Sequence, residues 1–394
     1  MLSLKPSKKP LKEGISMRKS LLAMAALMGI STLPAHAWKV SIDQETYADI
    51  GFSTIVRGIY EGKRTNDTNE KSRLNFYVPL FNITAGGHVN KLVYFSMNLE
   101  GASAGGSPVV RDSFIGLKLA DEFRLQAGLQ RAPFSRAALT GTYVQLFPYT
   151  PPYGALAVSP TNVGTAVSPR DAGVVVWGNV ADGMVKYYLG VTDGDTIGKN
   201  TDSSLAYTIR LQFTPTMLGF KGETGYTLAD TYLGKQNVLS MGFGYRVVGR
   251  NGTDTKMWTA DALYEQKFGD IVPNLQVGYI DQKDASGVAN QKASQLYAQG
   301  QLLFDQMVGF GKPALAVRFE QNKNKLPAGT SPKVNRFGVW GHYYIKGQAA
   351  KVSLGVDAVS LNSDAKARDC NSNVDGVQNC KNFTDVTLQL QTQF

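Results

Sequence analysis

The residues of this chain that could do chemistry are arginines and lysines at alternate positions of polar, strand-like segments. Five share the polar side of such segments: Arg57, Arg124, Lys186, Arg210 and Arg246. Three more flank or lie within a proline-rich stretch: Arg131, Arg136 and Arg170. A guanidinium group matches oxyanions through its forked donors. A narrow passage lined by such groups would concentrate anions and repel cations.

Each of these cations could instead pair with a nearby carboxylate. The same polar faces carry four candidates for this role: Glu100, Asp261, Glu265 and Asp357. For any single arginine the paired state is favoured, whereas the group as a whole also fits a modest anion preference. Both interpretations of the basic residues, ion pairing and anion preference, therefore stay open from the sequence alone.

Catalytic and metal-binding patterns are not found in the sequence. It contains no G-x-S-x-G, no H-E-x-x-H and no complete G-x-x-x-x-G-K-[ST] motif. Beyond residue 37 only His88 and His342 remain, far apart in the chain, which disfavours a zinc site. We therefore expect no enzyme activity, no metal site and no cofactor.

Residues 1–37 are typical of an N-terminal extension followed by a secretory signal peptide. A basic region starts at Met17, which we take as the expected start, and an apolar run covers residues 21–33. The small-x-small pattern at Ala35 to Ala37 predicts cleavage after Ala37. The apolar run is too short for a stable membrane-spanning helix, although a retained anchor is the alternative.

Export has consequences for charge and for cysteine chemistry. The formal net charge is +10, of which six cations and one glutamate in residues 1–37 contribute +5, which leaves +5 for residues 38–394. This mild, dispersed charge argues against a nucleic-acid binder. Cys370 and Cys380 lie close together in a polar stretch, and an oxidising compartment favours a disulfide between them over a redox or metal role.

The elements that would position these residues are strands with one apolar and one polar face. In residues 205–214, Tyr207, Ile209 and Leu211 alternate with polar neighbours, and similar alternation recurs along residues 38–394. Strands of about 9–11 residues suit a tilted crossing of a bilayer. A bilayer admits sheet only as a closed barrel, because open edges would leave backbone groups unpaired.

The last strand and the connections support a membrane barrel. Residues 384–394 alternate and end on an apolar-face aromatic, Phe394, which resembles the terminal signal read by the barrel assembly machinery of bacteria. Short links alternate with long polar ones, as outer-membrane barrels require, and both ends of the barrel then lie on one side, which needs an even strand count. The alternation slips between residues 220 and 247, where one strand gives a count of 16 and a missed strand gives 18. We prefer 16, with a short link near residues 215–219.

The longest link, residues 131–170, is the third external loop. It is rich in proline, at Pro133, Pro148, Pro151, Pro152, Pro160 and Pro169. Long links without regular structure are uncommon unless they are functional, and prolines lower the entropic cost of holding one shape. We expect this loop to fold into the barrel and narrow it, and a mobile surface loop is the alternative.

Two stretches show a resemblance to a known family. Residues 111–119 (RDSFIGLKL) and 125–134 (LQAGLQRAPF) resemble the phosphate-selective porin O and P family, where a strand enters the constriction loop. Residues 169–178 (PRDAGVVVWG) resemble the return of that loop to the wall, and residues 186–194 the next strand and turn. The resemblance covers residues 111–194.

The resemblance implies a 16-stranded, trimeric porin that takes up small solutes, often anions. By position, Arg131 and Arg170 would lie at the mouth of the constriction. The family's phosphate channels have densely basic pores, whereas the loop interior here carries only Arg136. Selenite, tellurite, sulfate or arsenate would therefore fit as well as phosphate.

These observations converge on an all-β transmembrane antiparallel barrel over residues 38–394, in the outer membrane of a Gram-negative bacterium. We expect passive uptake of small anionic solutes, with Arg131, Arg136, Arg170, Arg124, Lys186 and Arg210 as pore or anion-binding residues. The expected partners are membrane lipid, small anions, two further copies of the chain and the assembly machinery through Phe394, with no nucleic acid. The alternatives are a non-specific porin, the barrel of a larger envelope complex such as an electron-transfer conduit, a barrel enzyme, and a soluble secreted β-protein.

Overall fold

A computed structural model of the chain describes residues 38–64, 71–101, 108–148, 170–194, 204–250, 252–367 and 380–394. Within these ranges almost all regular structure is antiparallel sheet, and each helical piece has only three or four residues. No helix in the described ranges has the length and apolar character needed to cross a membrane. The predicted signal peptide, residues 1–37, lies outside the described residues.

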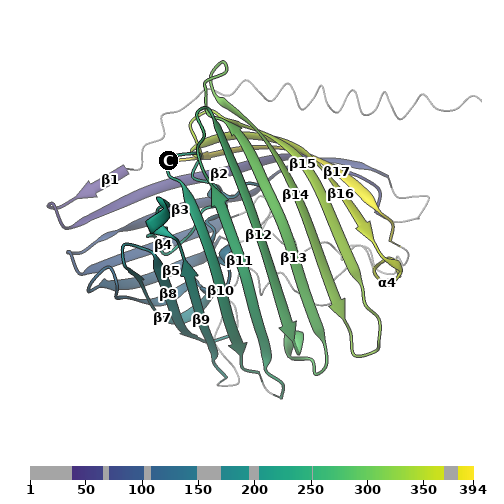
Figure 1. Cartoon of the computed structure of the whole chain (residues 1–394), viewed down its shortest axis with the longest axis horizontal. Coiled ribbons are helices and arrows are strands. Elements are labelled where there is room, and N and C mark those ends of the chain that lie inside the picture. Colours follow the sequence, from purple (N-terminus) through teal and green to yellow (C-terminus); the bar gives the residue numbers. More distant parts are fainter. Residues whose placement is uncertain are drawn as a thin grey trace, which may run out of the picture.

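Sixteen strands, β2 to β17, form a closed antiparallel barrel (Figure 1). Each strand pairs with the next along the chain, and β17 pairs back with β2 from Gln393 opposite Ser53 to Asp385 opposite Glu61. This closure satisfies the backbone without a free edge, as a bilayer requires. The predicted barrel and the preferred count of 16 are confirmed.

The strands, in chain order around the barrel, have these bounds: β2 (Tyr47–Glu61), β3 (Arg73–His88), β4 (Val93–Gly101), β5 (Val109–Lys118), β6 (Arg124–Arg131), β7 (Arg170–Val180), β8 (Val185–Thr192), β9 (Ala206–Phe213), β10 (Val238–Val248), β11 (Thr255–Glu265), β12 (Ile271–Lys283), β13 (Lys292–Phe304), β14 (Lys312–Lys325), β15 (Lys333–Tyr344), β16 (Ala350–Leu361) and β17 (Phe383–Gln393).

An extra strand, β1 (Trp38–Ser41), pairs with the start of β2, with Trp38 opposite Ile50. β1 therefore pairs with the same edge of β2 as β17 does, but nearer to the start of β2. At the junction the Phe52 amide donates to the Phe394 carbonyl at 2.9 Å, and the rings of these residues lie 5.5 Å apart. Phe394 is exposed on the outer face, whereas its reading by the assembly machinery stays a prediction.

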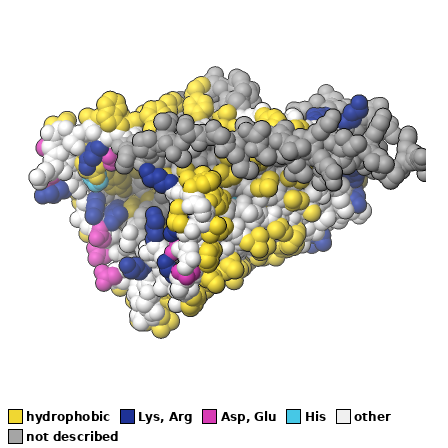
Figure 2. Space-filling view, turned by 90° about the horizontal axis from the view of Figure 1, so that it is seen from above, with side chains coloured by type: hydrophobic (Ala, Val, Ile, Leu, Met, Phe, Trp, Pro, Cys, Tyr) yellow, Lys and Arg dark blue, Asp and Glu magenta, His cyan; other side chains and the backbone are white. Residues whose placement is uncertain are grey.

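The two faces of each strand differ as the alternation predicts. On β9 the outward residues Tyr207, Ile209 and Leu211 are 44–56% exposed, whereas the inward Arg210 is fully buried. Figure 2 shows hydrophobic side chains, in yellow, over much of the visible surface of the described residues. The apolar faces therefore point to the lipid, and the polar side chains point to the interior.

One connection at the short-turn end differs from the prediction. Instead of a short link near residues 215–219 followed by a strand, residues 214–237 form a long connection between β9 and β10 that we call the inward turn. Its backbone carbonyls accept hydrogen bonds from inward-facing wall side chains, among them Lys186 and Gln276. The alternation slips here because the segment lies inside the barrel rather than in its wall.

Candidate functional site: the barrel interior

The first segment inside the barrel is residues 132–148, the described part of the long link, which we call the loop segment. It leaves β6 through a short helix, α2 (Arg136–Leu139), whose start is capped by the Ser135 hydroxyl accepting from the Ala138 amide. Further along, Lys351 Nζ donates to the Gln145 carbonyl at 2.8 Å and Gln391 Nε2 to the Tyr143 carbonyl at 2.7 Å. Residues 149–169 lie outside the described residues, and the narrowing of the passage by the whole loop stays a prediction.

The inward turn meets the loop segment from the opposite end of the barrel. The Gly141 amide donates to the Leu228 carbonyl at 3.1 Å, and the Leu228 amide donates to the Leu139 carbonyl at 3.0 Å. Asp230 extends this contact, because its amide donates to Val144 and its carboxylate accepts from the Leu146 amide. Burial raises the pKa of Asp230, and the Leu146 hydrogen bond only partly offsets this rise.

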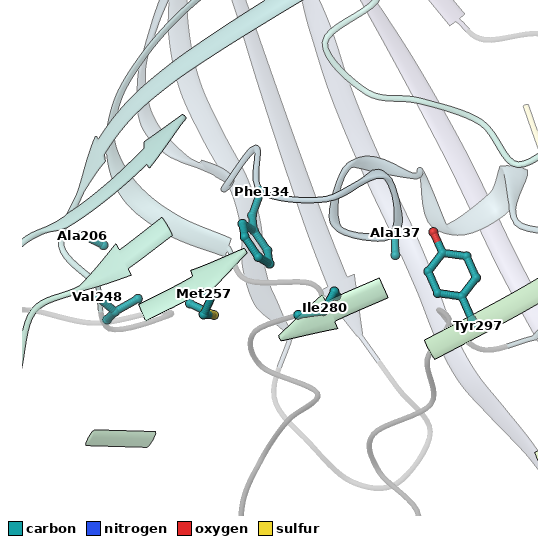
Figure 3. Close-up of a cluster of buried hydrophobic side chains, with 7 residues drawn as sticks. All are labelled: Phe134, Ala137, Ala206, Val248, Met257, Ile280 and Tyr297. Carbon is teal, nitrogen blue, oxygen red and sulfur yellow. The ribbon is translucent and has the colours of Figure 1, made fainter. Parts of the chain in front are cut away.

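Apolar packing holds the loop segment against the wall. Figure 3 shows Phe134 and Ala137 of the loop segment facing wall side chains of β9 to β13. All of the side chains in this cluster are at most 5% exposed. Burying such side chains typically contributes about 1.5–3 kcal/mol each for the larger ones, so this contact anchors the segment.

Buried charges provide the second anchor. Arg136 forms an ion pair with Glu223 of the inward turn, and the Arg136 amide donates to Asp261 at 3.0 Å. Arg210 binds both carboxylate oxygens of Asp261, at 2.7 and 2.8 Å. Lys186 Nζ donates to the backbone carbonyls of Glu223 and Gly225. Three of the predicted pore cations thus join the wall to the inserted segments, and their role as anion ligands stays a prediction.

The protonation of this network follows from its contacts. Burial alone would raise the pKa of Glu223, but the charge of Arg136 and the hydrogen bonds from Arg136 and Tyr232 outweigh it and lower the pKa below its usual value. Glu223 is therefore a carboxylate at neutral pH. Removing one partner of such a buried pair leaves an uncompensated charge, which typically costs about 3–5 kcal/mol.

Two cavities lie on the other side of the barrel, next to β3 to β7. One has a volume of about 430 Å³ and the other about 440 Å³, and both are lined by Asp112, Arg131 and Thr227. We call the inner wall next to them the open side, and the inner wall of β8 to β17, where most contacts of the inserted segments lie, the packed side. The same segments also reach β7, where Leu139 and Leu228 pack with Val175 and Trp177. The shared lining residues make Arg131 the central cation of the open side.

Arg131 and Arg170 are direct cross-strand neighbours on β6 and β7. Arg170 Nε lies 3.1 Å from Asp112 Oδ1, whereas the Arg131 guanidinium donates to the Ala138 carbonyl at 2.9 Å. Within the described ranges, no carboxylate lies within 4.0 Å of the Arg131 guanidinium. Both residues therefore lie at the base of the long loop and only Arg170 is neutralised, while their place at the mouth of a constriction stays a prediction.

Arg124, the last predicted site residue, lies at the short-turn end of the open side. It pairs with the exposed Asp121 at 2.6 Å and stacks over the Trp177 ring, 4.6 Å from its centroid. Together the residues that line the two cavities include four cations, Lys118, Arg124, Arg131 and Arg170, and one carboxylate, Asp112. The open side is therefore basic.

Sequence reasoning missed the inward turn and its carboxylate Glu223, as well as Asp112 and Asp171. The slip in alternation between residues 220 and 247 was the available signal for the inward turn. Asp171 is the partner of Arg246, at 2.9 Å. For the predicted disulfide, Cys380 is disulfide-bonded, whereas Cys370 lies outside the described residues.

Solved outer-membrane proteins share this architecture at low sequence identity. They include OmpF of Salmonella typhi in complex with daunomycin (TM-score 0.56, 17% identity, 91% of this chain and 100% of that chain). DcaP of Acinetobacter baumannii has a TM-score of 0.53 at 9% identity, covering 90% of this chain and 99% of that chain. The trimer form of OmpT of Vibrio cholerae has a TM-score of 0.52 at 12% identity, covering 88% and 99%. Identities this low show the fold alone.

Sequence comparison gives the family. An uncharacterized protein of Aquifex aeolicus (strain VF5) is 25% identical over 284 residues, which span 66% of this chain and 64% of that protein. The family model of phosphate-selective porin O and P matches residues 56–267, more than half of the chain. Family and fold indicate a channel rather than an enzyme, in the outer membrane of Gram-negative bacteria. The chain belongs to the phosphate-selective porin O and P family.

Proposed function

We propose that the protein forms a passive, water-filled channel for small anionic solutes, which pass along the open side of the barrel. The solute class is inorganic oxyanions: phosphate-like anions, selenite, tellurite and sulfate. The observation that carries this proposal is Arg131, which lines both cavities and has no carboxylate within ion-pair distance in the described part of the chain. Its forked donors suit an oxyanion, and its charge is not cancelled locally.

The contrast with the other inward arginines supports this choice. Arg136, Arg210 and Arg246 are each paired with a buried carboxylate and are at most 2% exposed. Paired charges create little net field, whereas an uncancelled charge beside an aqueous path raises the local anion concentration. Selectivity should therefore depend on Arg131 first and on the partly neutralised Arg170 second.

The test is the reversal potential of single channels in a potassium chloride gradient. The wild-type channel should prefer chloride, Arg131→Ala should reduce the permeability ratio about twofold or more, and Arg170→Ala should reduce it less. Lys256→Ala is the matched control, because Lys256 is exposed on β11 and its neighbours Thr255 and Met257 are buried. Unchanged ratios in both arginine variants would reject the proposal and favour a non-specific porin.

The solute class needs a separate measurement. Phosphate, selenite and sulfate should each reduce the chloride current of the wild-type channel, and this reduction should weaken in Arg131→Ala. Equal currents with and without these anions would limit the function to general anion passage. We also propose a homotrimer, which the trimer form of OmpT supports and which the mass of the detergent-solubilised protein tests.

A further inference from the structure

An aromatic cluster faces the open side near the short-turn end of the barrel. Inward positions of a porin are usually polar, yet Tyr94, Phe114 and Trp177 point inward from β4, β5 and β7 and line the 440 Å³ cavity. Tyr226 of the inward turn joins them. We call these four residues the aromatic vestibule.

The rings of the aromatic vestibule are held in defined positions. Trp177 and Tyr226 pack edge to face, with centroids 5.5 Å apart, and Tyr94 and Phe114 do so at 6.4 Å. The Tyr226 hydroxyl donates to the Arg131 carbonyl at 2.6 Å. The Tyr94 ring lies across Gly116, where an added Cβ would come within 2.1 Å of the ring. The arrangement thus depends on a glycine opposite Tyr94.

Several buried polar atoms of this cavity have no hydrogen-bond partner in the described part of the chain. Arg124 Nε is such a donor and Gln126 Oε1 such an acceptor, while Trp177 Nε1 and the Tyr94 hydroxyl face only each other. Trp177 is 3% exposed and Gln126 is 1% exposed. Buried polar groups in proteins almost always have partners, so unsatisfied ones beside a cavity indicate a site for a ligand with complementary atoms.

The charge around the aromatic vestibule selects the kind of ligand. Lys118 and Arg124 both pair with Asp121, and Asp112 pairs with Arg170, so Arg131 is the cation of this cavity that has no ion-pair partner in the described part of the chain. The donors of Arg124, Trp177 and Tyr94 and the charge of Arg131 suit a carboxylate group, and the four aromatic side chains that line the cavity suit a flat apolar body. A small inorganic anion would leave the ring surfaces uncovered.

We propose that the aromatic vestibule binds small aromatic carboxylates. The carboxylate group accepts hydrogen bonds from Arg124, Trp177 and Tyr94, and the ring of the ligand lies between the aromatic side chains. The site adds a second solute class to the channel and rests on the proposed function only in requiring that solutes enter from the open side.

The test is block of the single-channel chloride current by benzoate, with acetate as the carboxylate that lacks a ring. Benzoate should half-block the wild-type channel at about a tenfold lower concentration than acetate, because ring contacts and donor hydrogen bonds add. Trp177→Leu should reduce this difference to about twofold. Trp258→Leu is the matched control, since Trp258 is 39% exposed on β11, and should keep the tenfold difference.

A second variant covers the case in which Trp177→Leu does not assemble. Tyr94→Phe keeps the ring and removes one hydroxyl donor, so the half-blocking concentration of benzoate should rise about threefold while that of acetate changes less. Equal block by benzoate and acetate in the wild type, or an unchanged benzoate preference in Tyr94→Phe, would overturn the aromatic site. The reversal potential measured on the same channels decides the proposed function separately, because a wild type without anion preference would overturn that proposal and not this one.

Discussion

The packed side and the open side of this barrel are built from the same alternating strands, yet they use their inward cations differently. On the packed side Arg210 reaches across β10 to Asp261 on β11, and an added Cβ at Gly242 would come within 2.2 Å of its guanidinium. On the open side Arg131 lies beside two cavities without a carboxylate at 4.0 Å or less among the described residues. The first arrangement stabilises inserted segments, and the second leaves charge available to solutes.

The difference shows that a basic inward residue is not in itself a pore residue. Arg136, Lys186 and Arg210 are as inward as Arg131, but their donors are taken by Glu223, Asp261 and backbone carbonyls. Whether a cation serves the channel or the scaffold therefore depends on the segments that enter the barrel from either end. The inward turn supplies Glu223, the carboxylate that neutralises Arg136. The cations of the packed side therefore hold the inserted segments in place.

The largest expected effect comes from removing the inward turn. Replacing residues 220–236 by a short glycine-serine link should increase the single-channel conductance at least about twofold, because the packed side loses an inserted segment and both open-side cavities lose part of their lining. Deleting residues 38–44 is the control, since β1 lies outside the closed ring of strands and conductance should not change. An unchanged conductance of a folded deletion variant would contradict the division into two sides.

The next effect concerns stability. Glu223→Gln removes the buried charge that pairs with Arg136, and should lower the free energy of unfolding by about 3–5 kcal/mol. Heat-modifiable migration on gels, measured against temperature, would show an earlier transition. Glu122→Gln changes an exposed residue and should leave the transition in place.

The pH dependence of the stability difference between wild type and Glu223→Gln provides a stricter test. The pKa of Glu223 is lowered in the folded chain from its usual 4.5, so its contribution is fully present above that pH. It is lost as the pH falls through the lowered value, where wild type and Glu223→Gln should converge. A difference that persists unchanged in acid would assign the effect to packing rather than to charge.

The smallest effect is expected from a buried ion pair that joins the two sides, Arg246 on β10 with Asp171 on β7. Neutralising both partners of a buried pair, Arg246→Gln with Asp171→Asn, should change the reversal potential little, because the pair contributes no net charge. A shift as large as that of Arg131→Ala would show that solutes also pass along the packed side.

The barrel could be predicted from the sequence because lipid imposes a strict period on every strand. Tyr207, Ile209 and Leu211 had to face outward whatever the rest of the molecule does. The interior could not be predicted in the same way. Arg210 and Asp261 are separated by β10 and meet only because Gly242 lets the side chains cross that strand.

The contacts of the inward turn could not be predicted from the sequence either. Its residues fit neither a strand nor a short turn, because Glu223 and Asp230 are satisfied by partners distant in sequence, such as Arg136 and Leu146. A break in the alternation marked the place, but single-strand periodicity carries no information about what such a segment contacts. The resemblance around residues 111–194 located Arg131 and Arg170, and only the neighbouring segments reveal that Asp112 pairs with Arg170.

The central claim is that anions pass beside Arg131, and charge reversal at this residue tests it most directly. In Arg131→Glu channels, the reversal potential in a potassium chloride gradient should move from chloride preference toward potassium preference, while Lys256→Glu channels keep the wild-type value. An Arg131→Glu channel that conducts with the wild-type chloride preference would contradict the account.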